Sequence, residues 1–123
     1  MESAIDNAWK ALYFNNSKFQ AFAVSAGSKI IWQTSNWNLV NGIEEIDHSM
    51  RSGADISLDG TEYGTVIREK HRYAGTAPDG KGHFLMAQIV GDTWAIAWVE
   101  ESAIPALALV DLEMAAIGLK GAV

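Results

Sequence analysis

The residues that could support catalysis are scattered along this sequence. Its three histidines, His48, His71 and His83, lie far apart, without clustered carboxylates at the spacing of metal ligands. The sequence has no cysteine, no GxSxG nucleophile motif and no phosphate-binding loop. Catalysis needs a nucleophile, a base and an orienting group held together, and no segment supplies that set. We therefore expect a binding module that is not an enzyme and that uses no metal or cofactor.

Basic residues are concentrated in one part of an otherwise acidic chain. The chain has 15 acidic and 9 basic side chains and a formal charge of −6, which argues against nucleic-acid binding over the whole surface. Four of the nine basic residues fall between positions 68 and 81, namely Arg68, Lys70, Arg72 and Lys81. On two adjacent strands they would form a positive patch, suited to an acidic protein surface or a phosphoinositide headgroup. The alternative is that they protect exposed strand edges from aggregation.

Hydrophobic periodicity predicts the order helix, two strands, helix, four or five strands, helix. The helical patterns run from Ser3 to about Asn15, from Leu39 to Met50 with Asn38 as N-cap and Gly53 as stop, and from Ser102 to Lys120 with Ser102 as N-cap. The strand patterns are FQAFAVSA, KIIWQTS, residues 56–58, TEYGTVIREK, RYAGTA, HFLMAQIVG and TWAIAWVE. We expect one α+β domain over residues 1–123, with a central antiparallel β-sheet flanked by N- and C-terminal helices and a mid-chain helix.

The last predicted helix carries more apolar surface than a sheet can cover. Between Ala103 and Leu119 only Asp111 and Glu113 are charged. A helix on one face of a sheet would still show apolar side chains on its outer face, which predicts an interface with a partner.

Aromatic residues supply a second candidate surface. Trp9 and Tyr13 share one face of the first helix, and Trp32 lies on a predicted strand. Such rings line grooves that bind proline-rich peptides, although packing in the core is the alternative for each of them. Trp94 and Trp98 share one strand face, and we expect both to pack against a helix.

Three segments, FAVSAGSKIIWQTSNW, LDGTEYGTVIRE and VGDTWAIAWVEE, together with the element order, resemble the profilins. These are small actin-monomer-binding proteins, and the sequence looks most like those of Asgard archaea. The resemblance implies the profilin fold, with a largely monomeric protein that binds an actin monomer and limits or directs its polymerisation. It implies an actin-binding face at Val66, Ile67, Arg68, Arg72, His83 and Glu113.

The resemblance also bears on proline-rich peptides, which animal and plant profilins bind between their first and last helices. Trp32 matches the family tryptophan, but Ile117 stands where animal forms have a ring, and the C-terminus has no aromatic residue. The resemblance therefore implies that binding through Trp9, Tyr13 and Trp32 is weak or lost.

A Roadblock- or longin-type scaffold, which homodimerises and serves small GTPases, is the alternative to a profilin. It also has a mid-chain helix and an antiparallel sheet. The N-terminal segment lacks the features of a signal peptide, and no apolar stretch is long enough to span a bilayer. We therefore expect a cytoplasmic protein that is not transmembrane.

Overall fold

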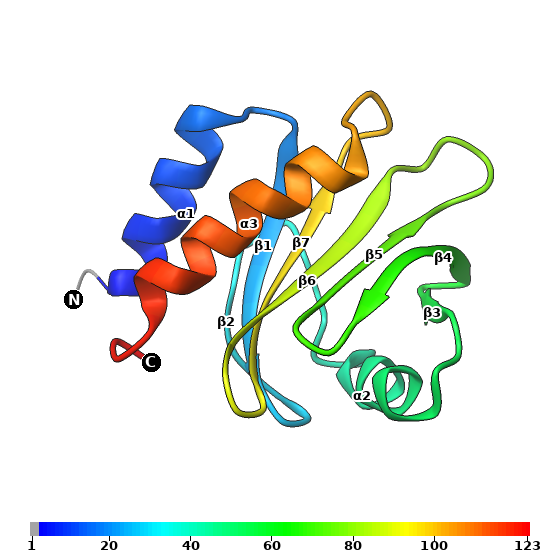
Figure 1. Cartoon of the computed structure of the whole chain (residues 1–123), viewed down its shortest axis with the longest axis horizontal. Helices are drawn as coiled ribbons and strands as arrows, with labels where there is room; N and C mark the ends of the chain where they lie inside the picture. The colour runs from blue at the N-terminus through cyan, green and yellow to red at the C-terminus, as the bar shows by residue number, and fades with distance from the viewer. Residues whose placement is uncertain (1–2) are drawn as a thin grey trace.

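The computed structural model describes residues 3–123, which form three helices and a seven-stranded antiparallel sheet (Figure 1). The helices are α1 (Ala4–Asn15), α2 (Ile43–Ser52) and α3 (Pro105–Leu119), and the strands are β1 (Phe19–Ala26), β2 (Lys29–Gln33), β3 (Ile56–Leu58), β4 (Thr61–Glu69), β5 (Arg72–Thr76), β6 (His83–Val90) and β7 (Thr93–Val99). The strand order is β2-β1-β7-β6-β5-β4-β3. The predicted α+β architecture is confirmed.

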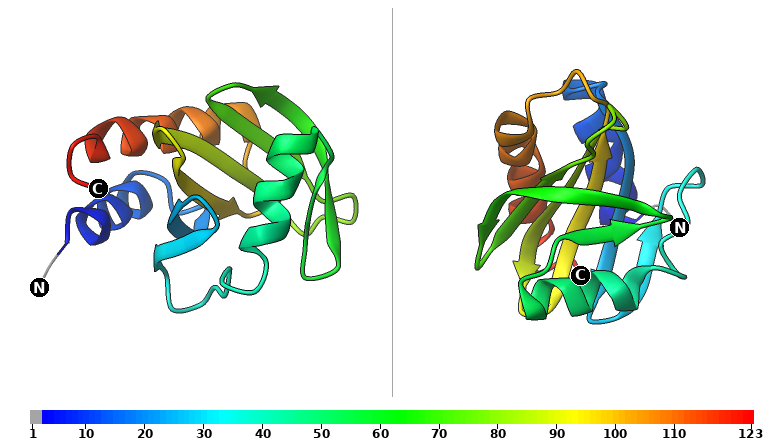
Figure 2. Two further views of the ribbon diagram at one scale, coloured as in Figure 1. Left: turned by 90° about the horizontal axis from the view of Figure 1, so that it is seen from below. Right: turned by 90° about the vertical axis from the view of Figure 1, so that its right-hand side faces the viewer.

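The sheet is covered on both faces. Helices α1 and α3 lie side by side on one face, and α2 lies on the other face beside β3 (Figures 1 and 2). Alternate strand residues enter two different cores, so that Leu85 packs beneath α1 and α3 while its neighbour Phe84 packs with residues of α2. We call these the α3 side and the α2 side of the sheet.

Helix α2 begins later than the sequence predicts. The chain first makes a turn in which the N–H of Gly42 donates to the carbonyl of Leu39, and the N–H of Leu39 donates to the Gln33 side chain. Leu58 packs so closely on Gly42 that a Cβ there would lie 2.6 Å from its Cδ1. Asn38 is therefore not the N-cap, and the helix starts at Ile43. Its predicted end at Gly53, with a φ of 82°, is confirmed.

Helix α3 also begins later than predicted, at Pro105 rather than just after Ser102. Ile104, the residue before proline, is extended, because the proline ring disfavours helical backbone at the preceding position. The Ser102 hydroxyl does not cap the helix and instead donates to the Glu100 carboxylate at 2.6 Å.

We expect Gly82→Ala to lower the free energy of unfolding by about 3 kcal/mol, because backbone strain and a steric clash add together. Gly82 has a φ of 104°, and a Cβ here would lie 2.5 Å from the Val99 carbonyl oxygen. Gly53→Ala is the matched control, since its φ is also positive but its Cβ would meet nothing within 4 Å. The control should lose only about 1 kcal/mol. Urea denaturation of both variants measures the difference, and equal losses would contradict the clash.

Candidate functional site

The outer face of α3 carries a row of exposed apolar side chains. Five large residues on the helix and its N-cap are 49% to 64% exposed, and we call them the α3 stripe: Ile104, Leu107, Val110, Met114 and Ile117. The opposite side of the helix is buried, with Leu109 and Leu112 at 0% exposure. The predicted surplus of apolar surface on this helix is confirmed. The sequence did not predict which residues form the α3 stripe, because a helix that is apolar all round has no amphipathic pattern to separate its faces.

Arg72 connects β5 to α3 beside the stripe. Its guanidinium donates to Glu69 Oε1 at 2.9 Å and to Glu113 Oε1 at 3.2 Å. These bonds, the one to Glu69 first, raise the pKa of Arg72, and the bond from Arg72 lowers the pKa of the Glu69 carboxyl. The structure thus brings together two of the predicted contact residues, Arg72 and Glu113, at the edge of the α3 stripe.

Strand β4 contributes two more of the predicted contact residues. A β-bulge between Thr65 and Ile67 leaves Val66 without a register partner on β5, and Val66 is 56% exposed. Ile67 packs against the core on the α3 side. Val66 therefore offers exposed apolar surface, whereas Ile67 mainly supports the strand.

Arg68 lies on the other side of the sheet from Arg72. It pairs in register with Tyr73, and its guanidinium carbon lies 4.9 Å from the centre of that ring, in the core of the α2 side. The guanidinium also donates to the Ala54 carbonyl. Since neighbouring strand residues point to opposite faces, Arg68 cannot share the face of Ile67. The expectation that one face holds both Arg68 and Arg72 is wrong.

His83 is buried, with 6% exposure. Its Nδ1 lies 2.9 Å from Thr76 Oγ1, and its Nε2 lies 3.1 Å from the Glu101 carbonyl oxygen. These contacts join β5, β6 and the segment before α3, so the structure gives His83 a supporting position rather than an exposed one.

The four basic residues do not form one patch, and that expectation is wrong. Lys70 and Lys81 lie in the turns at opposite ends of β5. The Lys81 Nζ atom lies 3.6 Å from Asp79 Oδ2. Arg68 and Arg72 are separated by the sheet itself, as described above. These residues are close in the sequence but do not share one face, because successive side chains of a strand point to opposite faces of the sheet.

The aromatic residues of the second candidate surface do meet. Trp9 and Tyr13 are 5.5 Å apart between ring centres, Trp9 stacks on Phe22 at 5.9 Å, and Phe22 and Trp32 make a T-shaped contact at 6.0 Å. Phe22 is fully buried, whereas Trp9 and Trp32 are half-buried and Tyr13 is 49% exposed. The three predicted residues therefore form one aromatic cluster over Phe22.

The expected core positions of Trp94 and Trp98 are only partly correct. Both are half-buried. Trp94 borders a surface hollow together with Met50 of α2, in line with packing on a helix. Trp98 instead lines a cavity and donates to the Lys81 carbonyl at 3.0 Å.

No protein-family model matches the chain. A curated relative, Loki profilin-2 from Lokiarchaeum sp. (strain GC14_75), is 32% identical over 92 residues, which cover 67% of this chain and 69% of the relative. The chain belongs to the profilin family. Thor profilin, from Thorarchaeota archaeon (strain AB_25), is 25% identical over 126 residues and covers 98% of both chains. These relatives confirm the predicted likeness to the profilins of Asgard archaea.

The solved structures agree with the sequence relatives. The profilin of a LokiProfilin2/rabbit actin complex has a TM-score of 0.91 to this chain at 27% identity, and the match covers 100% of both chains. The predicted profilin fold is confirmed, and the Roadblock or longin alternative is set aside. Since profilins are non-enzymatic binding proteins, the family also bears out the prediction of a binding module.

Neither a membrane-spanning helix nor a metal-binding cluster is found in the described part of this profilin. Within residues 3–123, no helix combines the length and apolar character needed to cross a bilayer. Nor do three or more His, Asp or Glu side chains of these residues gather where they could hold a metal ion.

We expect the stability of this profilin to fall in acid, partly through Asp55. The Thr65 hydroxyl and backbone N–H both donate to Asp55 Oδ1, and these bonds lower the pKa of the carboxyl. A lowered folded-state pKa gives stability that is present above the unfolded pKa of about 4 and is lost as the pH falls through the folded value. Asp55→Asn should therefore reduce the fall in the free energy of unfolding between neutral pH and about pH 3, as measured by urea denaturation. An acid dependence identical to that of the parent chain would contradict this role.

Proposed function

We propose that this profilin binds an actin monomer through the α3 stripe, the Arg72–Glu113 pair and the exposed edge at Val66. The observation that carries the proposal is the full-length similarity to a profilin solved in complex with rabbit actin. The exposed apolar row on α3 supports it independently, since a contiguous patch of this kind marks a protein interface.

The proposed surface has the composition of an interface with an apolar centre. Leu107 and Val110 lie in the middle of the α3 stripe and are 63% and 49% exposed. The Arg72–Glu113 pair lies beside them, already held at 3.2 Å, and would meet polar groups at the rim. Because Arg72 is paired with two carboxylates, most of the affinity should come from the apolar centre and not from net charge.

An actin assembly assay tests this function. A protein that occupies one end of an actin monomer should inhibit spontaneous assembly in proportion to its concentration and without a cofactor. Arg72→Glu should weaken the inhibition, because it reverses the charge beside the stripe and separates β5 from Glu113. Arg68→Glu is the comparison, and it should inhibit more strongly than Arg72→Glu, because Arg68 lies on the α2 side. Absence of inhibition by the parent chain at equimolar concentration would overturn the proposal.

Weak binding of proline-rich peptides is a second candidate function. The aromatic cluster of Trp9, Tyr13 and Trp32 favours it, since such rings hold proline-rich helices. The groove between α1 and α3, of about 540 Å³, favours it less, because none of the described residues that line it is aromatic. Titration with a proline-rich peptide should therefore give weak binding that Trp32→Ala abolishes, and binding that survives this change would contradict the assignment.

Phosphoinositide binding has less support from the geometry. The hollow that contains Arg68 and Lys70 is also lined by Arg51 and by three carboxylates, those of Asp47, Glu69 and Asp92. This mixture gives little net positive charge for a phosphate group.

We propose that the protein acts as a monomer in the cytoplasm, as a regulator of the actin cytoskeleton.

A further inference from the structure

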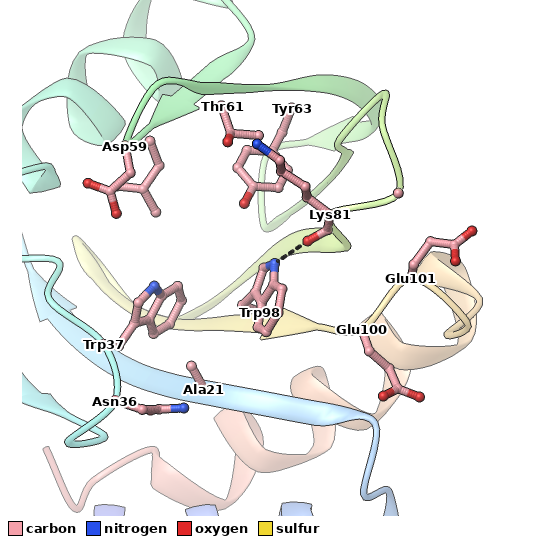
Figure 3. A pocket seen from close by; sticks show the side chains of 12 residues that line it. Ala21, Asn36, Trp37, Asp59, Thr61, Tyr63, Lys81, Trp98, Glu100 and Glu101 are labelled. Atoms are coloured by element: carbon pink, nitrogen blue, oxygen red, sulfur yellow. Dashed lines mark hydrogen bonds between the residues drawn. The ribbon is translucent and has the colours of Figure 1, made fainter.

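A cavity of about 550 Å³ lies on the α2 side of the sheet, beneath the β3–β4 hairpin (Figure 3). Three aromatic residues line it: Trp37 from the loop after β2, Tyr63 from β4 and Trp98 from β7. Tyr63 belongs to the buried core on the α2 side, and Trp37 and Trp98 pack against that core. The cavity is therefore separated by the sheet from the α3 stripe.

The aromatic walls are held in place by the surrounding fold. Trp37 packs edge to face on Phe84 at 6.2 Å between ring centres, and Tyr63 packs on the same ring at 5.7 Å. The Trp98 indole N–H donates to the Lys81 carbonyl at 3.0 Å, drawn as the dashed line in Figure 3. Because both indoles remain half-buried, each presents part of its ring to the cavity without rearrangement.

Carboxylates form the rim of the cavity. Asp59, Glu100 and Glu101 line it, against one positively charged side chain among the described residues there, Lys81. The Lys81 ammonium is 3.6 Å from Asp79 Oδ2. Burial raises the pKa of Tyr63, and the negative charges of Asp59 and Asp79 raise it further. The cavity thus combines aromatic walls with a negative local field.

A tight turn fixes the position of Asp59. Asp59 and Gly60 have φ values of 51° and 79°, as in the two-residue turns that join antiparallel strands. Figure 3 shows the Asp59 carboxylate across the cavity from Trp37. Asparagine tolerates the same backbone conformation, so the charge can be removed there without loss of the turn.

We propose that this cavity binds an arginine side chain from a basic segment of a partner protein. A guanidinium is flat enough to stack on an indole, gains cation–π attraction there, and can donate to a carboxylate at the same time. An acidic or phosphorylated ligand would meet the carboxylates of the rim, and an uncharged apolar peptide would leave them without partners. Since the α3 stripe is on the other side of the sheet, both surfaces can be occupied at once.

Titration of the isotope-labelled protein with the peptide acetyl-Gly-Arg-Gly-Arg-Gly-amide tests the proposal by NMR. We expect saturable shifts of the indole N–H signals of Trp37 and Trp98, but not of Trp9 or Trp32. The same peptide with citrulline in place of arginine has nearly the same shape without the charge, and it should cause no saturable shift. A lysine peptide should bind more weakly than the arginine peptide, because an ammonium cannot stack as a plane.

Two variants test the carboxylate rim. Asp59→Asn should weaken binding of the arginine peptide about fivefold, as expected for one partly exposed ion pair. Glu62→Gln is the matched control, because Glu62 is an exposed carboxylate of the same hairpin that does not line the cavity, and it should leave the affinity unchanged. Equal binding of the citrulline peptide, equal effects of the two variants, or shifts confined to other tryptophans would each overturn the proposal. None of these readouts depends on actin.

Discussion

Replacement of Val110 by glutamate is expected to weaken binding of an actin monomer about 30-fold or more. Val110 lies at the centre of the α3 stripe, between Leu107 and Met114, and is 49% exposed in the free protein. Loss of a hot-spot contact at the centre of an interface costs about 2 kcal/mol or more, which is about 30-fold in affinity. A carboxylate in this place would also lose its hydration when the partner docks. The free protein should keep its stability, because the side chain is exposed and glutamate is a better helix former than valine.

Val90→Glu is the matched control for this change. Val90 is the same residue type with a similar exposure of 54%, but it lies at the end of β6, away from α3. Isothermal titration of actin monomers with the parent chain and both variants should show a large loss for Val110→Glu alone. Equal affinities of the two variants would show that the α3 stripe is not the contact surface.

Replacement of Phe22 by alanine is expected to destabilise the protein by about 4 kcal/mol, the largest effect of a single substitution on stability that we predict. Phe22 is 0% exposed and lies between two indoles, stacked on Trp9 and in a T-shaped contact with Trp32. Its removal would leave a cavity between α1 and β2 and would end the contact that joins the aromatic cluster. A loss of this size is a large part of the stability of an ordinary domain.

Urea denaturation measures this effect, with Ile31→Ala on β2 as the comparison. Ile31 is 46% exposed, so its truncation should cost well under about 1 kcal/mol. Phe22→Leu should recover part of the loss, since leucine fills much of the space without the ring contacts. A loss below about 1 kcal/mol for Phe22→Ala would mean that the aromatic cluster is not a packed unit.

The sequence predicted the elements of this fold well because their patterns are local. The nearly continuous apolar run of β1 and the turn at Asp59 and Gly60 depend on neighbouring residues alone. The start of α3 was placed wrongly although its cause, the extended residue before Pro105, is local. The start of α2 was placed wrongly because contacts from residues outside the helix decide it. Gln33 binds the N–H of Leu39, and Leu58 packs against Gly42, and neither contact is visible in a helical pattern.

Composition alone was enough to predict one candidate surface, whereas another depended on which way each side chain points. The surplus of apolar residues on the last helix needed no knowledge of the fold, whereas the basic patch needed the direction of each side chain. A β-bulge at Val66 and the alternation of strand residues place Arg68 and Arg72 on opposite sides. The arginine-binding cavity could not be foreseen, because Trp37, Asp59 and Trp98 come from separate segments that meet only when the sheet forms.

Cross-saturation NMR of the labelled protein in complex with unlabelled actin monomers tests the central claim most directly, because it detects the amides that lie against actin. We predict signal loss along the outer face of α3, around Leu107 and Val110, and at Val66 and Arg72. Loss confined to β2 and α2, or no loss in an equimolar mixture, would contradict the proposed surface.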